Sequence, residues 1–333
     1  MRDAAGVSAV VPGWPVAFRG SLAVAAGLTT WGRLRGPRFV RLFPDVYCPT
    51  GDDPPDLRLR SLGAYRLVEG RGVLAGYSAA VLLDADCARY RDVPAEVTVA
   101  GGGQRVHDGL VVRRERIAPG ETTWVDGVRC TSALRTAYDL GRQEDLVEAV
   151  VAVDRLANRH RFSPDLLLHF GAHYRGGPGT GRLCTTLAYA NPYAGSPMES
   201  RLRLIIVRAG LPTPRVQWVV QDAGARRAVW LDLAWPEHRI GIEYEGEGHT
   251  DPVEVLRDAG RYTRLVDRGW RIYRYTRFDV YGDPGRIVAE LTRALATSRR
   301  RRPRVRRGAR DGGSRPFDAS GARCCCPSMI EQQ

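Results

Sequence analysis

Carboxylates on two apolar segments near the C-terminus are the side chains best suited to chemistry in this 333-residue chain. Both segments have the composition of β-strands, in which residues two apart share a face. The residues predicted to share one side are Trp230, Asp232 and Ala234 in the first strand and Gly241, Glu243 and Glu245 in the second. Burying unpaired carboxylates is costly, and oxygen ligands from two strands suit Mg²⁺ or Mn²⁺. We therefore expect a metal site capable of phosphoryl-transfer or hydrolytic chemistry.

The same acids have a structural interpretation, in which Asp232 caps a strand end and the others form a solvated edge paired with arginines. The stretch from Ile240 to Leu256 contains five acids and no arginine or lysine. A structural ion-pair network normally interleaves opposite charges. The charge pattern therefore favours the metal site over the structural interpretation.

The basic residues of the chain, 50 in all, are arginines without exception, and the net charge is +13. Arginine binds phosphate well but cannot lose its proton to act as a base. From Arg299 onward, ten arginines against three acids contribute +7 of this charge. We expect this tail to be disordered, either holding nucleic acid through counterion release or forming a solvated extension.

The cysteines and the hydropathy pattern exclude other classes of protein. Four of the seven cysteines are scattered and three form a run near the C-terminus, without the CxxC spacing of a zinc site. The sequence has neither an 18-residue apolar span nor a signal-peptide pattern. We therefore expect a soluble cytoplasmic protein without a membrane partner.

The N-terminal region has the order helix, turn, helix, hairpin. We predict a helix over Ser21–Ala26, a second one capped by Thr29 and running to Arg35, and a hairpin over Phe39–Cys48. This is the order of a winged helix-turn-helix, whose second helix and wing contact phosphates. The arginines that would bind DNA there are Arg33, Arg35, Arg38 and Arg41. The alternative is a small helical cap whose arginines are only solvated.

The middle region alternates predicted helices and strands without a catalytic constellation. The expected elements are helices over Gly76–Leu83, Ser132–Leu140 and Glu144–Ala157 and strands over Glu96–Val99 and Leu110–Arg114. We predict an α/β protein, α+β overall, with four regions. These are a winged-helix region (1–55), a mixed α/β middle region (56–192), a last α/β domain (193–297) and the tail (298–333).

The last domain opens with a capping box, Ser196 to Glu199, that begins a helix. Its further predicted elements are strands over Arg215–Val220, Ala228–Ala234 and Arg239–Glu245, a helix over Pro252–Arg268, a strand over Trp270–Tyr275 and a helix over Pro284–Ala296. The order αβββαβ with acids on the second and third strands resembles the restriction-endonuclease-like core of the PD-(D/E)xK nuclease superfamily.

Two more specific resemblances follow from short motifs. Leu231-Asp232-Leu233-Ala234-Trp235-Pro236, Glu243-Tyr244-Glu245-Gly246 and His249 are similar to the domain-of-unknown-function family numbered 559. That family is grouped with the very-short-patch-repair (Vsr-like) endonucleases, and the resemblance covers about Ser196 to Leu295. More loosely, Gly27-Leu28-Thr29 through Val46-Tyr47, with Thr131-Ser132 and Arg135 to Leu140, resembles the AbiEi-type antitoxin or regulator family.

The nuclease resemblance implies a role for each acid. Asp232 stands at the position of the first metal-binding aspartate and Glu243 at that of the second acid. Glu245 occupies the position of the superfamily lysine and would be a third ligand. Glu199 matches an acid that some members use as a further ligand, although its capping role explains it equally well. No proline precedes Asp232, and no lysine in the chain can replace the missing one.

Two further roles would fall to residues beyond the strands, and the resemblance places His249 where the Vsr-like enzymes have a histidine near the scissile phosphate. His249 would accept the proton of the attacking water, and Arg261 or Arg257 would stabilise the transition-state charge. Arg261 could instead pair with Asp258.

The sequence therefore predicts a DNA endonuclease that uses Mg²⁺ or Mn²⁺ and is delivered to DNA by its N-terminal region. The alternative is an AbiEi-like antitoxin or transcriptional regulator with a catalytically silent nuclease fold. In that case a toxin or defence-system protein would be its partner.

Overall fold

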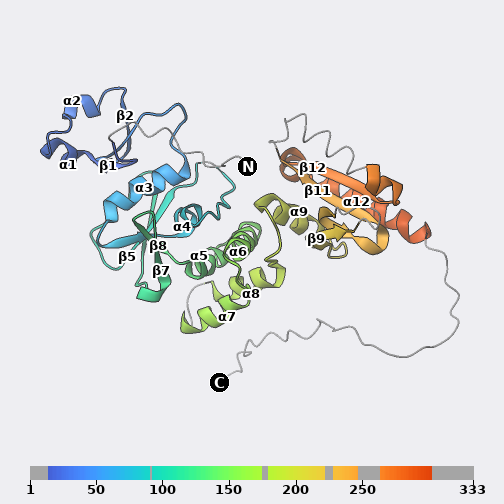
Figure 1. Cartoon of the computed structure of the whole chain (residues 1–333). Coiled ribbons are helices and arrows are strands. Elements are labelled where there is room, and N and C mark those ends of the chain that lie inside the picture. The colour runs from blue at the N-terminus through green and yellow to red at the C-terminus, as the bar shows by residue number, and fades with distance from the viewer. Residues whose placement is uncertain (1–13, 91, 175–178, 222–227, 247–262, 302–333) are drawn as a thin grey trace, which may run out of the picture.

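A computed structural model describes residues 14–90, 92–174, 179–221, 228–246 and 263–301. Within these residues the chain is an α/β protein with three sheets, as the sequence predicts. Figure 1 shows the N-terminal elements at one end, the last sheet at the other end, and helices α5 and α6 between them. No helix in this described part is long and apolar enough to cross a bilayer.

The N-terminal sheet has three strands in the order β1-β3-β2, all antiparallel. Its elements are β1 (Phe18–Arg19), α1 (Gly20–Ala25), α2 (Trp31–Leu34), β2 (Phe39–Phe43) and β3 (Val46–Pro49). The predicted hairpin is confirmed by the pairing of β2 with β3. The predicted cap of the second helix is wrong by one residue, because Thr30 rather than Thr29 accepts the N–H of Arg33, at 3.3 Å. The Thr29 side chain is buried instead.

The middle region contains a sheet of five strands in the order β6-β5-β4-β8-β7, covered by helices. Its strands are β4 (Gly72–Leu74), β5 (Ala95–Val99), β6 (Leu110–Arg114), β7 (Thr122–Val125) and β8 (Val128–Thr131). Its α-helices are α3 (Leu57–Val68), α4 (Gly76–Leu82), α5 (Ala133–Gly141), α6 (Leu146–His160), α7 (Leu166–Gly171) and α8 (Thr180–Tyr189), with short 3-10 helices η1 (Pro119–Glu121) and η2 (Ala172–Tyr174). One apolar core extends from Phe43 in β2 to Leu183 in α8, so the hairpin packs into the same core.

The last sheet has four strands in the order β12-β11-β10-β9. Its region comprises α9 (Pro197–Arg208), β9 (Arg215–Val220), β10 (Val229–Trp235), η3 (Pro236–His238), β11 (Ile240–Glu245), β12 (Arg271–Thr276), α11 (Arg277–Gly282) and α12 (Pro284–Arg301). β9, β10 and β11 are antiparallel, whereas β12 runs parallel to β11. Residues 263–267 are helical and Arg268 is in a turn, so the predicted helix ends one residue early; its residues 252–262 lie outside the described residues.

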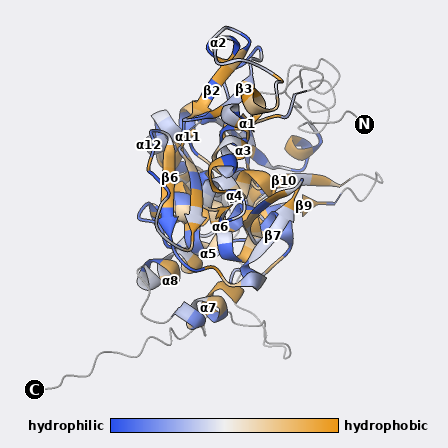
Figure 2. Ribbon diagram, turned by 90° about the vertical axis from the view of Figure 1, so that its left-hand side faces the viewer, coloured by the Kyte–Doolittle hydropathy of each residue, from blue (hydrophilic) through white to orange (hydrophobic). Residues whose placement is uncertain are grey.

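Apolar residues cover both faces of this last sheet. On one face Leu233 and Ile242 pack against α9, α11 and α12, through residues such as Ile206 and Leu291. On the other face Leu231 packs with Leu265 and Trp270. Figure 2 shows the apolar colouring that runs along β10. The sheet is therefore the middle of three layers, and its polar residues stand out against an apolar background.

Buried ion pairs join the middle region to α9, the first helix of the last region. Arg201 on α9 pairs with Glu148 on α6, and Arg203 pairs with Asp154 at 2.8 Å. Asp154 also accepts the hydroxyl of Ser200 at 2.7 Å. All four charged side chains are at most 10% exposed. Because buried charges are costly unless paired, these contacts fix α9 firmly against α6.

Candidate functional site

Asp232 lies in β10 where that strand departs from regular pairing. The register between β10 and β11 ends at Leu233 opposite Ile242. At the next position the partner of β11 is a side chain: Oδ2 of Asp232 accepts the backbone N–H of Tyr244 at 2.9 Å. That N–H belongs to the peptide that links Glu243 to Tyr244. The Asp232 carboxylate is therefore held against the peptide that follows Glu243, the residue predicted to bind the same ion.

The regular alternation predicted for β10 is wrong at Asp232. Leu231 and Ala234 pack in one apolar cluster, whereas Leu233 and Trp235 pack in the cluster on the opposite face. The side chains before and after Asp232 therefore do not follow one regular alternation between the two faces of the sheet. Gln217 of β9 lies between the residues that pair with Leu231 and Leu233. It has a φ of 50°, a conformation that residues other than glycine rarely adopt, so β9 is distorted at the same level.

The second acid, Glu243, is buried in β11 with 7% of its surface exposed. In the parallel register it lies opposite Arg274 of β12. Arg274 donates from Nη2 to Oε1 of Glu245 at 2.8 Å. The third acid therefore has an arginine partner from the neighbouring strand.

Arg274 is the residue that reasoning along the sequence missed. The stretch from Ile240 to Leu256 has acids and no arginine, because the arginine that pairs with Glu245 comes from a strand about thirty positions later. The parallel pairing expected of a strand reached through a crossover helix is the signal that could have found it. Gln217 was missed as well, and nothing in its sequence context predicts its positive φ.

Glu199 occupies the first turn of α9, as predicted, and its side chain is 8% exposed. The expected capping bond is present, since Ser196 accepts the N–H of Glu199 at 3.2 Å. The reciprocal bond differs from that of a regular capping box: Oε2 of Glu199 accepts the N–H of Gly195 at 2.9 Å. The same oxygen accepts the side-chain amide of Gln217 at 2.8 Å. Glu199 thus ties the start of α9 to β9 beside Asp232, and its role as a metal ligand stays a prediction.

The donor groups fit a divalent cation in part. Among the described residues, no three His, Cys, Asp or Glu side chains are close enough to hold a metal ion. Asp232 and Glu243 are two carboxylates on adjacent strands, β10 and β11, and this number suits Mg²⁺ because the ion is usually bound by one or two carboxylates with water and substrate phosphates. Glu245 fits less well, since Arg274 already neutralises it. His249 and Arg261, with Arg257 and Asp258, lie outside the described residues.

The N-terminal region presents a second group of predicted site residues. Arg33, Arg35, Arg38 and Arg41 are all exposed. Within the described part of the chain none of these four forms an ion pair; Arg35 donates to the carbonyl of Trp31 at 3.1 Å. This contrasts with Arg201 and Arg203, which are buried in ion pairs. The positive charge of these four arginines is therefore not neutralised by an acid in the described part of the chain and is available to a ligand.

Asp45 is the single acid between residues 14 and 50, and its carboxylate already has an ion-pair partner and hydrogen-bond donors. Its carboxylate accepts from Arg19 at 3.1 Å and from the backbone N–H and hydroxyl of Ser21 at 2.7 and 2.6 Å. Burial alone would raise the pKa of Asp45, but these bonds outweigh burial and lower the pKa below 3.8. Asp45 therefore stays charged near neutral pH and stabilises the start of α1.

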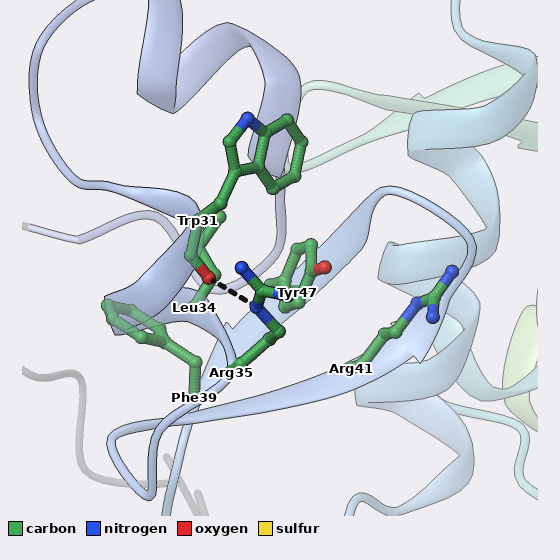
Figure 3. Close-up of a pocket in the computed structure, with 6 residues that line it drawn as sticks. All are labelled: Trp31, Leu34, Arg35, Phe39, Arg41 and Tyr47. Atoms are coloured by element: carbon green, nitrogen blue, oxygen red, sulfur yellow. Dashed lines mark hydrogen bonds between the residues drawn. The ribbon is translucent and has the colours of Figure 1, made fainter.

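A pocket of about 390 Å³ lies beside these arginines. It is lined by Trp31, Leu34, Arg35, Phe39, Arg41 and Tyr47, from α2, its C-terminal end and the hairpin. Figure 3 shows the ring of Tyr47 between the guanidinium groups of Arg35 and Arg41, with the indole of Trp31 above it. Aromatic rings and cations therefore line the same opening.

Comparison with known proteins finds two relatives in Mycobacterium tuberculosis. They are the uncharacterized protein MT2308 of strain CDC 1551 / Oshkosh and the uncharacterized protein Rv2248 of strain ATCC 25618 / H37Rv. Each is 32% identical to this chain over 199 residues, which cover 59% of this chain and 70% of the relative. No protein-family model matches the chain. On this similarity, the chain belongs to the same family as these two mycobacterial proteins.

Proposed function

We propose that the chain is a metal-dependent DNA endonuclease in which Asp232 and Glu243 hold Mg²⁺ or Mn²⁺. The observation that carries this proposal is the contact of the Asp232 carboxylate with the peptide that follows Glu243, at 2.9 Å. It holds the Asp232 carboxylate beside the backbone of β11, the strand in which Glu243 is buried, and apolar residues cover both faces of this sheet. The strand order, three antiparallel strands and one parallel strand, is the order implied by the resemblance to the PD-(D/E)xK superfamily.

Each of these residues would have a separate role in the reaction. A bound ion would act as a Lewis acid for phosphodiester hydrolysis. The N–H of Tyr244 orients the Asp232 carboxylate, and burial restricts the motion of Glu243. Arg274 lies on β12 opposite Glu243 and pairs with Glu245, and its guanidinium could also contact a phosphate. The roles proposed for His249 and Arg261, as proton acceptor and charge stabiliser, are retained in this proposal.

The N-terminal region would bring this site to DNA. Its four exposed arginines, without ion pairs among the described residues, are suited to phosphate contacts. Asp45 does not offset them, because it is bound by Arg19 and Ser21. Binding would therefore weaken as the salt concentration rises.

A DNA-binding regulator with a silent nuclease fold is the second candidate. The ion pair between Arg274 and Glu245 favours it, because it turns one of the three predicted ligands into a structural side chain. The lack of any lysine points the same way. In this candidate function a toxin or defence-system protein would be the partner.

Supercoiled plasmid incubated with Mg²⁺ or Mn²⁺ separates the two candidates. The endonuclease proposal expects wild-type protein to nick or linearise the plasmid, and Asp232→Asn and Glu243→Gln to lose this activity while still binding DNA. Asp267→Asn is the matched control, because Asp267 is an exposed acid of the same region. Wild-type protein that binds DNA tightly but cuts none of several substrates would support the regulator.

A further inference from the structure

The N-terminal region is poorly built to read duplex DNA through a helix. Its second helix, α2, has 4 residues, which is a length of about 6 Å at 1.5 Å per residue. A recognition helix lies in a major groove about 12 Å wide and presents several side chains to base edges. A single turn offers too few positions for this, so α2 does not have the form of a recognition helix.

The pocket beside α2 has the chemistry of a site for an unstacked base. Its volume of about 390 Å³ lies within the range of about 300–1,000 Å³ that is usual for small-molecule sites. Among the lining residues, Trp31 is 45% exposed and lies at the mouth of the pocket. Tyr47 and Leu34 are only 6% and 2% exposed and form its floor. An exposed indole over an apolar floor provides a stacking surface, which single-strand-binding proteins use for bases.

The charges around the pocket complement a nucleic-acid strand. Arg35 and Arg41 line the pocket itself, and Arg33 and Arg38 are exposed on the same short stretch of chain. Figure 3 shows Arg35 and Arg41 on opposite sides of the Tyr47 ring. A base bound between the aromatic rings would therefore have a guanidinium on either side for the phosphates that flank it.

We propose that this pocket binds an unpaired base of single-stranded DNA, with Trp31 stacking on the base and Arg35 and Arg41 contacting the adjacent phosphates. The proposal rests on the proposed nucleic-acid function but not on cleavage. It assigns base contact to the pocket and leaves the carboxylates of β10 and β11 for the chemistry.

The test is the affinity of the full chain for a labelled oligothymidylate of about 12 nucleotides, a length within the usual site sizes. Fluorescence anisotropy in EDTA prevents cleavage during the measurement. An abasic strand of the same length offers the same phosphates without bases, and a duplex of that length offers bases that are stacked. Trp31→Ala removes the stacking ring, Trp31→Phe keeps one, and Trp124→Ala is the matched control because Trp124 is 65% exposed on β7.

We expect Trp31→Ala to weaken binding of oligothymidylate by roughly 5- to 150-fold, which corresponds to the loss of one stacked base. Trp31→Phe should recover most of the affinity, and Trp124→Ala should not change it. Binding of the abasic strand should be insensitive to Trp31→Ala but should weaken with Arg35→Gln and Arg41→Gln.

An unchanged affinity of Trp31→Ala for oligothymidylate would overturn the proposal. An equal loss on the abasic strand, or duplex binding that is as tight and as sensitive to Trp31→Ala, would also overturn it. Circular dichroism of each variant verifies that it folds. If Trp31→Ala does not fold, the affinity of Trp31→Phe for the three strands provides the comparison instead. Trp31-dependent binding without any plasmid cleavage would leave this proposal standing and remove the nuclease proposal alone.

Discussion

Arg274 on β12 and Glu245 on β11 form an ion pair across parallel strands, with 2.8 Å between Nη2 and Oε1. Both side chains are partly exposed, at 41% and 35%. The three acids predicted as ligands therefore differ in their surroundings. The Asp232 carboxylate accepts the N–H of Tyr244 and Glu243 is buried in β11, whereas Glu245 is partly exposed and pairs with Arg274.

This difference predicts unequal effects on cleavage. Glu245→Gln should keep the cleavage rate within about tenfold of wild type, whereas Asp232→Asn and Glu243→Gln should each lose more than about 100-fold, because even outer partners of a metal site cost about 10–100-fold. Initial rates of plasmid nicking measure this. An equal loss in all three variants would return Glu245 to the set of ligands.

Glu199 provides a test between structural and catalytic roles. Glu199→Ala removes the bonds to Gly195 and Gln217, so it should lower the free energy of unfolding by about 1–3 kcal/mol. Glu199→Gln keeps an acceptor oxygen and should lose less. Urea unfolding gives the stability, and plasmid nicking should persist in both variants. Loss of nicking at unchanged stability would instead mark Glu199 as a metal ligand.

The buried pair of Arg203 and Asp154 should be important for stability. Asp154→Ala leaves the Arg203 guanidinium buried without its anion, which should cost about 3–5 kcal/mol. The exposed pair of Arg182 and Glu144 is the matched control, and Glu144→Ala should cost less than about 1 kcal/mol. Denaturant unfolding of both variants makes the comparison. Similar small losses would show that α6 and α9 do not depend on this pair.

Asp45 should make the N-terminal region sensitive to acid. Its pKa is lowered in the folded chain, so its stabilising effect is present above the unfolded value of 3.8 and is lost as the pH falls through the lower folded value. The difference in unfolding temperature between wild type and Asp45→Asn should therefore shrink below about pH 4. Asp126→Asn is the control, since Asp126 is 77% exposed. A difference that stays constant with pH would contradict the assigned cause.

The order of elements in the last sheet could be predicted because its strands are apolar and its turns carry clear breaks. The bounds of β9, Arg215–Val220, agree with the prediction to the residue. The opening helix was found through Ser196, whose side chain caps it as expected. Periodicity and capping are local properties, and they are readable from a single sequence.

The details of the site were less accessible because they depend on contacts between distant segments. The change of faces at Asp232 accompanies an unusual φ at Gln217 on another strand. The partner of Glu245 comes from β12, and the partner of Arg203 comes from α6. Long-range contacts of this kind follow from register and packing, which alternation in one segment does not determine.

Single-turnover cleavage of an end-labelled DNA duplex over a range of Mg²⁺ concentrations tests the central claim most directly. The account predicts that wild-type protein cuts at a rate that rises with Mg²⁺ and saturates, and that Asp232→Asn and Glu243→Gln bind the duplex but do not cut it. Cleavage that persists in both variants would contradict the assignment of these carboxylates. Tight binding by wild type without cleavage at any Mg²⁺ or Mn²⁺ concentration would contradict the endonuclease itself.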